Sequence, residues 1–280
     1  MTSSRTIVIG DLHGCHDEAV ALLDKCEAAA NDRVIWLGDL VDRGPDNDKC
    51  VDLVMRREKL QGSPACIVGN HEQRHLGYCD VELKTGKPAA QIPTHVATRQ
   101  QLRPEHYDYF RSLPLFIRLP EFNAVCVHAG CFPGLTIEQQ PHRILTHAQM
   151  IRPFDKWGNL HKGKDAEKTV WPSRVPKGEE SEWKFWTHFW DGPERVIFGH
   201  SVTDKPLVTD KVVGIDGGCC FGRELWAVVL PSWEIVKVPS QCGDRGKDYR
   251  GRAVAAAEEE KIRGNRINLF QIHGNVSSFS

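Results

Sequence analysis

Six side chains of metal-binding type stand just after short apolar runs of the sequence. They are Asp11, His13, Asp39, Asn70, His128 and His200. Their oxygen and imidazole donors, with no cysteine among them, suit Mn²⁺, Fe or Zn²⁺ better than a soft metal. Six ligands are too many for one catalytic ion that keeps an open position, but they fit two ions roughly 3.5–4 Å apart that share a carboxylate. Two such cations lower the pKa of a shared water and hold a phosphoryl group in line for attack.

Three further side chains stand beside these ligands. Arg43 follows Asp39 by four residues, and its guanidinium fork matches two oxygens of a phosphate, so we expect it to bind the substrate. His71 directly follows Asn70 and would lie at the edge of the metal site, where a protonated imidazole can supply the proton to a leaving alkoxide. Asp42 could orient and charge that imidazole.

The segments that precede these residues alternate between strand and helix patterns. Apolar, β-branched runs predict strands at residues 6–9, 33–37 and 65–68, and helical spacing predicts helices at residues 17–29 and 47–60. Apolar strands that alternate with helices imply parallel pairing in a sheet buried on both faces. Ligands of such sheets bind beyond the carboxyl ends of the strands, where the polar clusters stand.

The same patterns continue downstream. Further strands are predicted at residues 124–127, 194–198, 212–216, 225–230 and 233–238. The first two end at His128 and at His200, and we expect 212–216 and 225–230 to belong to a second sheet. Residues 94–112 are predicted as a helix broken near Pro104.

Composition narrows the class of protein. The 280 residues carry 36 Lys and Arg against 37 Asp and Glu, a net charge of −1 that gives no general attraction to nucleic acid or to an anionic membrane. No apolar run approaches the roughly 20 residues that a membrane helix needs, and the first residues lack the apolar core of a signal peptide. The 10 cysteines are scattered without a CxxC pair, so we expect reduced thiols in a cytoplasmic protein.

Five motifs, taken together, resemble the phosphoprotein phosphatase family of the calcineurin-like metallophosphoesterases. They follow the order GDxHG, GDxVDRG, GNHE, HxG and GH, at Gly10–Gly14, Gly38–Gly44, Gly69–Glu72, His128–Gly130 and Gly199–His200. The resemblance implies an α/β fold, a sandwich of two mixed β-sheets flanked by helices, with residues 1–240 as the catalytic domain. It also implies two divalent metal ions, for which Mn²⁺ is our first choice and Fe or Zn²⁺ the alternatives.

The resemblance assigns each metal ligand a place. Asp11 and His13 would hold one ion, Asp39 would bridge, and the remaining three ligands would hold the other ion. Asn70 would also bind the substrate, and Arg43, His71 and Asp42 would take the roles argued above. The family has a second phosphate-binding arginine between its last two motifs, for which Arg152 is our choice and Arg174 the rival.

The substrate is less constrained than the chemistry. The stretch 214–225 resembles bacterial and phage members, including diadenosine-tetraphosphatase-like hydrolases, whereas Asp42–Gly44 and Asn70–Glu72 are closer to protein phosphatases. We therefore expect a serine/threonine phosphoprotein phosphatase. The alternative is a hydrolase of dinucleoside polyphosphates or of polyphosphate, so the partner is a phosphoprotein or a nucleotide.

Two regions fall outside these motifs. Residues 153–193 form a tryptophan-rich insertion, in which Trp183, Trp186 and Trp190 have the i, i+3, i+7 spacing of one buried helix face. An aromatic wall for a base or peptide ring is the alternative. The tail, residues 241–280, is predicted to be helical and to pack on or extend the domain.

Two rival functions use the same residues. His71 to His75 spell HExxH, which on a helix can bind zinc in a metalloprotease, but this hypothesis leaves the other four motifs without a purpose. His75 is then expected at the surface or behind the metal ligands. A non-catalytic binding protein is disfavoured because no metal ligand is missing.

Overall fold

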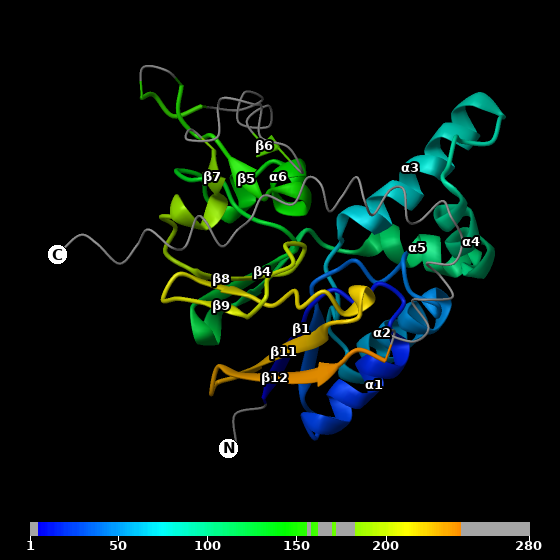
Figure 1. The fold of residues 1–280 in the computed structure, drawn as a ribbon, viewed down its shortest axis with the longest axis horizontal. Coiled ribbons are helices and arrows are strands. Elements are labelled where there is room, and N and C mark those ends of the chain that lie inside the picture. The colour runs from blue at the N-terminus through cyan, green and yellow to red at the C-terminus, as the bar shows by residue number, and fades with distance from the viewer. Residues whose placement is uncertain (1–4, 156–157, 162–169, 172–182, 242–280) are drawn as a thin grey trace.

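The computed structural model describes residues 5–155, 158–161, 170–171 and 183–241 (Figure 1). Its first sheet has the strand order β12-β11-β1-β2. The strands are β1 (Thr6–Ile9), β2 (Arg33–Trp36), β11 (Glu224–Leu230) and β12 (Glu234–Pro239). β1 pairs with β2 in parallel and with β11 in antiparallel, so the sheet is mixed.

The second sheet has the order β3-β4-β8-β10-β9. It contains β3 (Phe116–Leu119), β4 (Ala124–Val127), β8 (Arg195–Phe198), β9 (Leu207–Val208) and β10 (Val212–Gly214). The three central strands are parallel and the two edge strands are antiparallel. A small third sheet joins β5 (Met150–Ile151) to β6 (Val170–Trp171) and β7 (Lys184–Phe185).

The two main sheets pack face to face, as alternation along the strands shows. In β1, Val8 points into the core between the sheets, while Ile7 and Ile9 point into the outer core under the helices. In β4, Cys126 lies in the inter-sheet core and Val125 in the outer core of the second sheet. Strands buried on both faces explain the continuous apolar runs of the sequence and confirm the predicted α/β sandwich of two mixed sheets.

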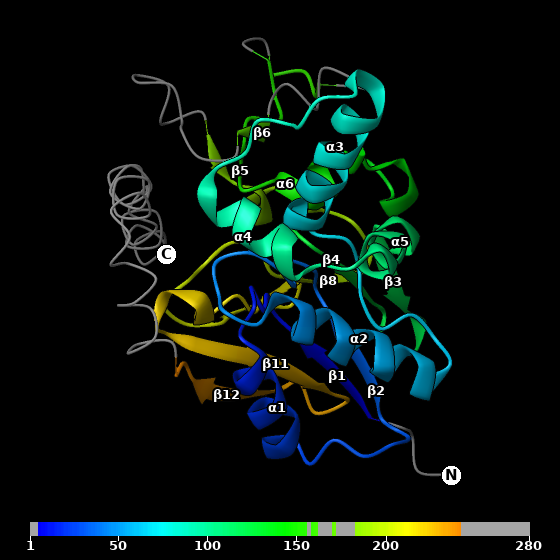
Figure 2. The ribbon, with the colours of Figure 1, turned by 90° about the vertical axis from the view of Figure 1, so that its right-hand side faces the viewer.

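Helices cover the outer faces (Figure 2). The longer ones are α1 (His16–Lys25), α2 (Asn47–Gln61), α3 (Asn70–Thr85), α4 (Pro93–Gln101), α5 (Pro104–Ser112) and α6 (His142–His147). Single 3₁₀ turns form η1 (Pro120–Phe122), η2 (Ile137–Gln139), η3 (Trp186–His188) and η4 (Cys219–Phe221). α1 and α2 lie on the first sheet, and α4 ends before Pro104 as expected.

The strand predictions need two corrections. Residues 65–68 form only one parallel bridge, between Cys66 and Trp36, because the backbone then turns away and Val68 N–H donates to Pro114 O. β11 and β12 belong to the first sheet rather than the second, since the whole of β1 pairs with β11 and β12 pairs with β11 in turn. Pairing partners depend on contacts distant in sequence, which a local pattern does not encode.

The tryptophan-rich segment is also not a helix where the structure describes it. Trp183 and Phe185 are buried while Lys184 between them is exposed, the alternation of strand β7, and Trp186 begins η3. Trp183, Trp186 and Trp190 are all buried in the outer core of the second sheet, as the buried-face hypothesis required. However, Trp183 directly precedes β7, Trp186 begins η3 and Trp190 follows η3, so no helix carries them. The predicted helix at 241–280 lies outside the described residues, apart from Gln241.

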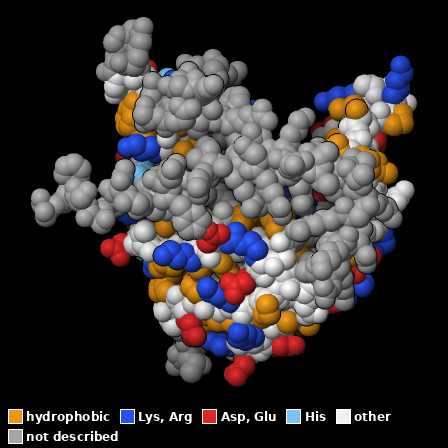
Figure 3. Space-filling view, viewed as in Figure 1, with side chains coloured by type: hydrophobic (Ala, Val, Ile, Leu, Met, Phe, Trp, Pro, Cys, Tyr) orange, Lys and Arg blue, Asp and Glu red, His pale blue; other side chains and the backbone are white. Residues whose placement is uncertain are grey.

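Two observations complete the picture of the chain. No disulfide joins the nine cysteines within the described residues, and no described helix is long and apolar enough to cross a membrane. The described surface visible in Figure 3 carries interspersed acidic and basic side chains, in keeping with the net charge of −1.

Candidate active site

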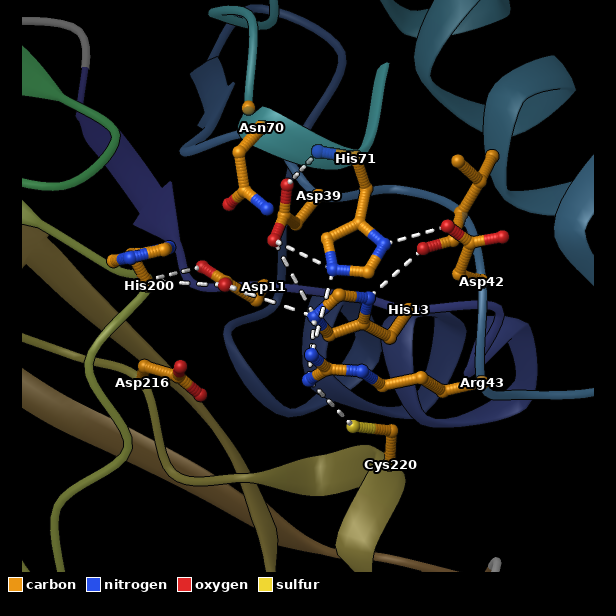
Figure 4. A network of polar contacts seen from close by, with 12 residues as sticks. Asp11, His13, Asp39, Asp42, Arg43, Asn70, His71, His200, Asp216 and Cys220 are labelled. Atoms are coloured by element: carbon orange, nitrogen blue, oxygen red, sulfur yellow. Dashed lines mark hydrogen bonds and ion pairs between the residues drawn. The ribbon is translucent and has the colours of Figure 1, made fainter. Parts of the chain in front are cut away.

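The polar motifs include the residues that follow β1, β2, β4 and β8. Figure 4 shows Asp11, Asp39, Asn70 and His200 lying close together. The turns that bring them together are tight, and five non-glycine site residues have a positive φ: His13, Asp39, Asp42, Arg43 and His200. Such left-handed conformations cost roughly 1–3 kcal/mol each and persist only where the surroundings hold them. Here backbone hydrogen bonds join the turns, from His13 N–H to Asp39 O at 2.8 Å among others.

Glycines permit the close approach of two of these turns. A Cβ on Gly14 would lie 2.8 Å from the backbone of Gly44, and a Cβ on Gly44 would lie 2.2 Å from His13 O. The terminal glycines of the GDxHG and DRG motifs are therefore required by packing, because no side chain fits between the backbones.

The first half of the centre consists of Asp11 and His13. His13 Nε2 lies 3.5 Å from Asp39 Oδ2 and 4.0 Å from Asp11 Oδ2. The other ring nitrogen, Nδ1, is 2.8 Å from Val41 O. Because a carbonyl oxygen only accepts, Nδ1 donates, which leaves the Nε2 lone pair facing the carboxylates, as a metal-ligating histidine requires.

The second half consists of Asn70, His128 and His200. His128 Nε2 lies 3.5 Å from Asp39 Oδ1 and 3.1 Å from Asn70 Oδ1, while its Nδ1 donates to Leu37 O at 2.6 Å. The His200 ring is 5.0 Å from that of His128, and its buried Nε2 has no hydrogen-bond partner among the described residues. A buried, orphaned imidazole nitrogen beside carboxylate and amide oxygens fits a metal ligand.

Asp39 joins the halves, because one of its oxygens faces His13 and the other faces His128. Donor atoms meet within 4.8 Å in two groups that both contain Asp39, one with His13 and His71 and one with His128 and His200. The structure thus brings all six predicted ligands together, and the arrangement fits the predicted bridge. Which residues ligate stays a prediction.

The pKa shifts of the buried carboxyl and imidazole groups also indicate a site for cations. Burial raises the pKa of Asp39 to about 7 and that of Asp11 well above its usual value, with the nearby charge of Asp216 adding to the second shift. Burial lowers the pKa values of His13 and His200 well below their usual range. Buried carboxylates beside neutral imidazoles are costly without a counter-charge, and divalent metal ions would supply it.

His71 and Asp42 form the pair expected next to the metal ligands. His71 Nδ1 lies 2.5 Å from Asp42 Oδ2, and the His71 backbone N–H donates to Asp39 Oδ1 at 2.9 Å. Burial alone would raise the pKa of Asp42, but the hydrogen bonds from His71 and His75 hold it far below its usual value. The carboxylate therefore stays ionised and favours the protonated form of His71, against burial, which lowers the pKa of His71 well below its usual range.

The Arg43 side chain lies against His13 of the first half and against His71. Its Nη1 lies 3.2 Å from His13 Nε2 and its Nη2 lies 3.4 Å from His71 Nε2. The guanidinium also lies 5.0 Å from the centre of the Phe221 ring, near Cys220. This position, between His13 and His71, suits binding of the non-bridging oxygens of a phosphoryl group.

Two residues of the site were missed by the sequence argument. Glu72 is fully buried and accepts hydrogen bonds from the backbone N–H groups of Asp39, Leu40 and Gly69 at 2.8–2.9 Å, which fixes the bridging turn. The GNHE motif contains it but does not reveal this role. Asp216, after β10, lies beside Asp11 (Figure 4), and its position after an apolar strand was the available signal.

The same contacts exclude the HExxH protease hypothesis. α3 does place His71 and His75 one turn apart, but both imidazoles face Asp42. Glu72, which would be the base, already accepts three backbone hydrogen bonds. His75 is not at the surface but behind the site, fully buried.

The second phosphate-binding arginine stays a prediction. Arg152 follows β5, and its guanidinium lies 5.5 Å from the ring centre of Trp183. Its rival Arg174 lies outside the described residues.

Comparison with known proteins agrees with this geometry. The family model described as calcineurin-like phosphoesterase matches residues 4–204. The chain belongs to this family. Its members are metallophosphoesterases, so the chain is a phosphoester hydrolase, and the expected resemblance is confirmed.

Two curated proteins and one solved structure are similar to this chain over most of its length. The chain is 26% identical over 250 residues to bis(5'-nucleosyl)-tetraphosphatase PrpE (asymmetrical) of Halalkalibacterium halodurans, covering 84% of this chain and 93% of that protein. It is 27% identical over 279 residues to a symmetrical bis(5'-nucleosyl)-tetraphosphatase of Neisseria meningitidis, covering 86% and 98%. A crystal structure of a proposed diadenosine tetraphosphatase superposes with a TM-score of 0.65 at 26% identity, covering 86% and 96%.

Proposed function

We propose that the chain hydrolyses dinucleoside polyphosphates at a centre of two divalent metal ions. The observation that carries the two-metal centre is Asp39, whose two oxygens face His13 on one side and His128 on the other. The observation that favours this substrate is the similarity, over more than four fifths of the chain, to proteins named bis(5'-nucleosyl)-tetraphosphatases. This reverses the order of our two expectations, since the phosphoprotein was first from the sequence.

The chain's residues divide the work of hydrolysis. The six predicted ligands, Asp39 included, would hold the divalent ions, which would supply activation of a water molecule and neutralise the phosphoryl oxygens. Arg43, 3.2 Å from His13, binds the non-bridging oxygens and holds the phosphoryl group in line. As the new P–O bond forms and the bond to the leaving oxygen breaks, His71 gives its proton to that oxygen. Asp42, at 2.5 Å, stabilises the charged imidazole until then.

A phosphoprotein monoester is the second candidate, and one contact favours it. A serine or threonine alkoxide is a poor leaving group and needs a proton donor, which the short His71–Asp42 contact provides. A nucleotide phosphate leaves more readily and depends less on that proton.

A comparison of substrates tests the proposal. The chain, supplied with Mn²⁺, is offered diadenosine tetraphosphate, a phosphothreonine peptide and inorganic polyphosphate, and kcat/KM is measured for each. We expect the dinucleotide to have the highest kcat/KM, and anion-exchange analysis to give either AMP with ATP or ADP alone. A higher kcat/KM for the phosphopeptide would restore the protein phosphatase hypothesis.

A further inference from the structure

Both oxygens of the Asp42 carboxylate are held by histidines of one helix. His71 Nδ1 lies 2.5 Å from Oδ2, and His75 Nε2 lies 2.9 Å from Oδ1. We propose that His75 is a positioning residue, which holds Asp42 and thereby keeps His71 aligned to protonate the leaving group. This inference rests on the role proposed above for His71.

The surroundings of His75 argue that its polarity serves Asp42. The side chain is fully buried, and its Nδ1 has no hydrogen-bond partner among the described residues. Since the carboxylate only accepts, Nε2–H is the donor to Asp42. An apolar side chain of similar size would fill the same space without an orphaned nitrogen, so packing alone does not explain a histidine here.

Asp42 is a residue that needs to be held. Its φ of 72° and the φ of 73° at Arg43 place two consecutive side chains in the left-handed region, which residues with a Cβ rarely adopt. The Asp42 backbone N–H donates to Asn47 Oδ1 at 2.7 Å. That bond fixes the main chain, while the rotation of the carboxylate is fixed by one imidazole on each oxygen.

Helix α3 fixes the two histidines relative to each other and so restrains the Asp42 carboxylate. His71 and His75 are four residues apart on α3, so they lie on the same face and reach one carboxylate together. Without His75 the carboxylate would be free to turn about its Cβ–Cγ bond, and the His71 ring would lose its fixed partner.

The neighbouring cluster of Asp42, His71 and His95 is already engaged in polar contacts. Donor atoms of Asp42, His71 and His95 gather within 4.8 Å, as a metal site would require. However, Arg74 Nη1 lies 3.4 Å from both His71 Nδ1 and His95 Nε2. Asp42 already accepts from His71 and His75, and His95 Nδ1 lies 2.8 Å from Tyr78 Oη, so we assign this cluster to hydrogen bonding.

The experiment compares His75→Leu with His75→Gln, whose amide N–H can still reach Asp42. The Mn²⁺-loaded chain is assayed on phenyl phosphate, a poor leaving group, and on p-nitrophenyl phosphate, a good one. We expect His75→Leu to lower kcat for phenyl phosphate by about 10–100-fold, as loss of an outer-shell partner typically does. The loss should be smaller for p-nitrophenyl phosphate, KM should not change, and His75→Gln should recover most of kcat.

His106 is the matched control. It is also fully buried, and its Nε2 lies 3.2 Å from the carboxylate of Asp52, away from the site. His106→Leu should leave the ratio of the two substrates unchanged even if it lowers the melting temperature. If His75→Leu does not fold, His75→Asn, whose amide is too short to reach Asp42, replaces it.

Two further measurements separate the possible failures. By proton NMR, the hydrogen-bonded imidazole proton of His71, identified by its loss in His71→Ala, should shift in His75→Leu and stay in His75→Gln. In an Asp42→Asn background, His75→Leu should have no additional effect on kcat. Equal losses on both substrates, no recovery in His75→Gln, or an unmoved resonance would overturn the inference. If His71→Ala itself shows no leaving-group dependence, the proposed role of His71 fails first.

Discussion

The two halves of the predicted metal centre offer similar donor side chains but have different neighbours. In each half a histidine donates Nδ1 to a backbone carbonyl and turns Nε2 toward Asp39. Around His13 in the first half lie Arg43, at 3.2 Å, and His71, with ring centres 4.7 Å apart. Around His128 in the second half lie Asn70, at 3.1 Å, and His200, with ring centres 5.0 Å apart.

This difference predicts different roles for the residues around the two halves. Arg43 and His71, which would bind the phosphoryl group and protonate the leaving group, both lie against His13 of the first half. In the second half, Asn70 is the residue expected to bind the substrate as well as a metal ion. Substitutions near the first half should therefore discriminate between leaving groups. Substitutions in the second half should affect all substrates alike.

Asp39→Asn should have the largest effect, because Asp39 belongs to both halves. We expect a loss of kcat beyond the roughly 10–100-fold that loss of a ligand's outer partner costs, equal for all substrates, with less metal bound in both halves. Steady-state kinetics and elemental analysis measure this. A variant that keeps most of its rate would show that Asp39 is not the bridge.

His71→Ala should come next and should reveal the asymmetry. General acid catalysis is worth about 10²–10⁴-fold, and we expect a loss in that range for phenyl phosphate and a smaller one for p-nitrophenyl phosphate. Both metal ions should be retained, because Asn70 rather than His71 is the expected ligand. Loss of metal would instead make His71 a ligand of the first half.

Arg43→Ala should cost less and should not discriminate. A hydrogen bond to a charged group contributes about 1.5–3 kcal/mol, which corresponds to a loss of kcat/KM of roughly 10–100-fold. The loss should be the same for both aryl phosphates, because Arg43 holds the phosphoryl oxygens whatever group leaves. A marked preference for one leaving group would place Arg43 on the leaving oxygen instead.

The smallest expected effect concerns His147, at the end of α6 beside the second half. Burial, with smaller contributions from the charges of His128, Arg143 and Arg74, lowers the pKa of His147 to about 4. The unfolded chain, with a histidine pKa of about 6.5, binds more protons between these two values, so stability falls as the pH falls from 6.5 towards 4.

Replacement of His147 by Gln should flatten that fall. Urea unfolding at pH 7 and pH 5, with a chelator present, measures the slope, and His142→Gln at the exposed start of α6 is the control. If both variants keep the slope of the parent chain, His147 does not titrate as the structure indicates.

Much of the site could be predicted because its residues are local to strand ends. Asp11 and Asp39 follow β1 and β2 within a few residues, and parallel strands end at one edge of a sheet. The His71–Asp42 pair was predictable for the same reason, since both residues adjoin ligands. These parts required only the order of strands and turns.

The parts that failed depend on contacts between distant segments. The prediction that β11 belongs to the second sheet was wrong, because the pairing of β11 with β1 joins residues more than 200 positions apart. The helix predicted around Trp186 was wrong because β7 is fixed by pairing with β5, which a spacing of three and four residues does not reveal. The partner of His75 was not predictable, because α3 has to fold against the turn of Asp42 before the contact exists.

The number of metal ions that the chain binds is the most direct test of the proposed two-metal centre. The chain is stripped with a chelator, titrated with Mn²⁺, and analysed for metal content and for hydrolysis of p-nitrophenyl phosphate. We predict that activity is lost on stripping and returns as two ions bind per chain. We also predict that His13→Ala in the first half and His128→Ala in the second each retain a single ion. Full activity in the stripped chain, or one ion in the parent that either substitution removes, would contradict a centre built from two halves.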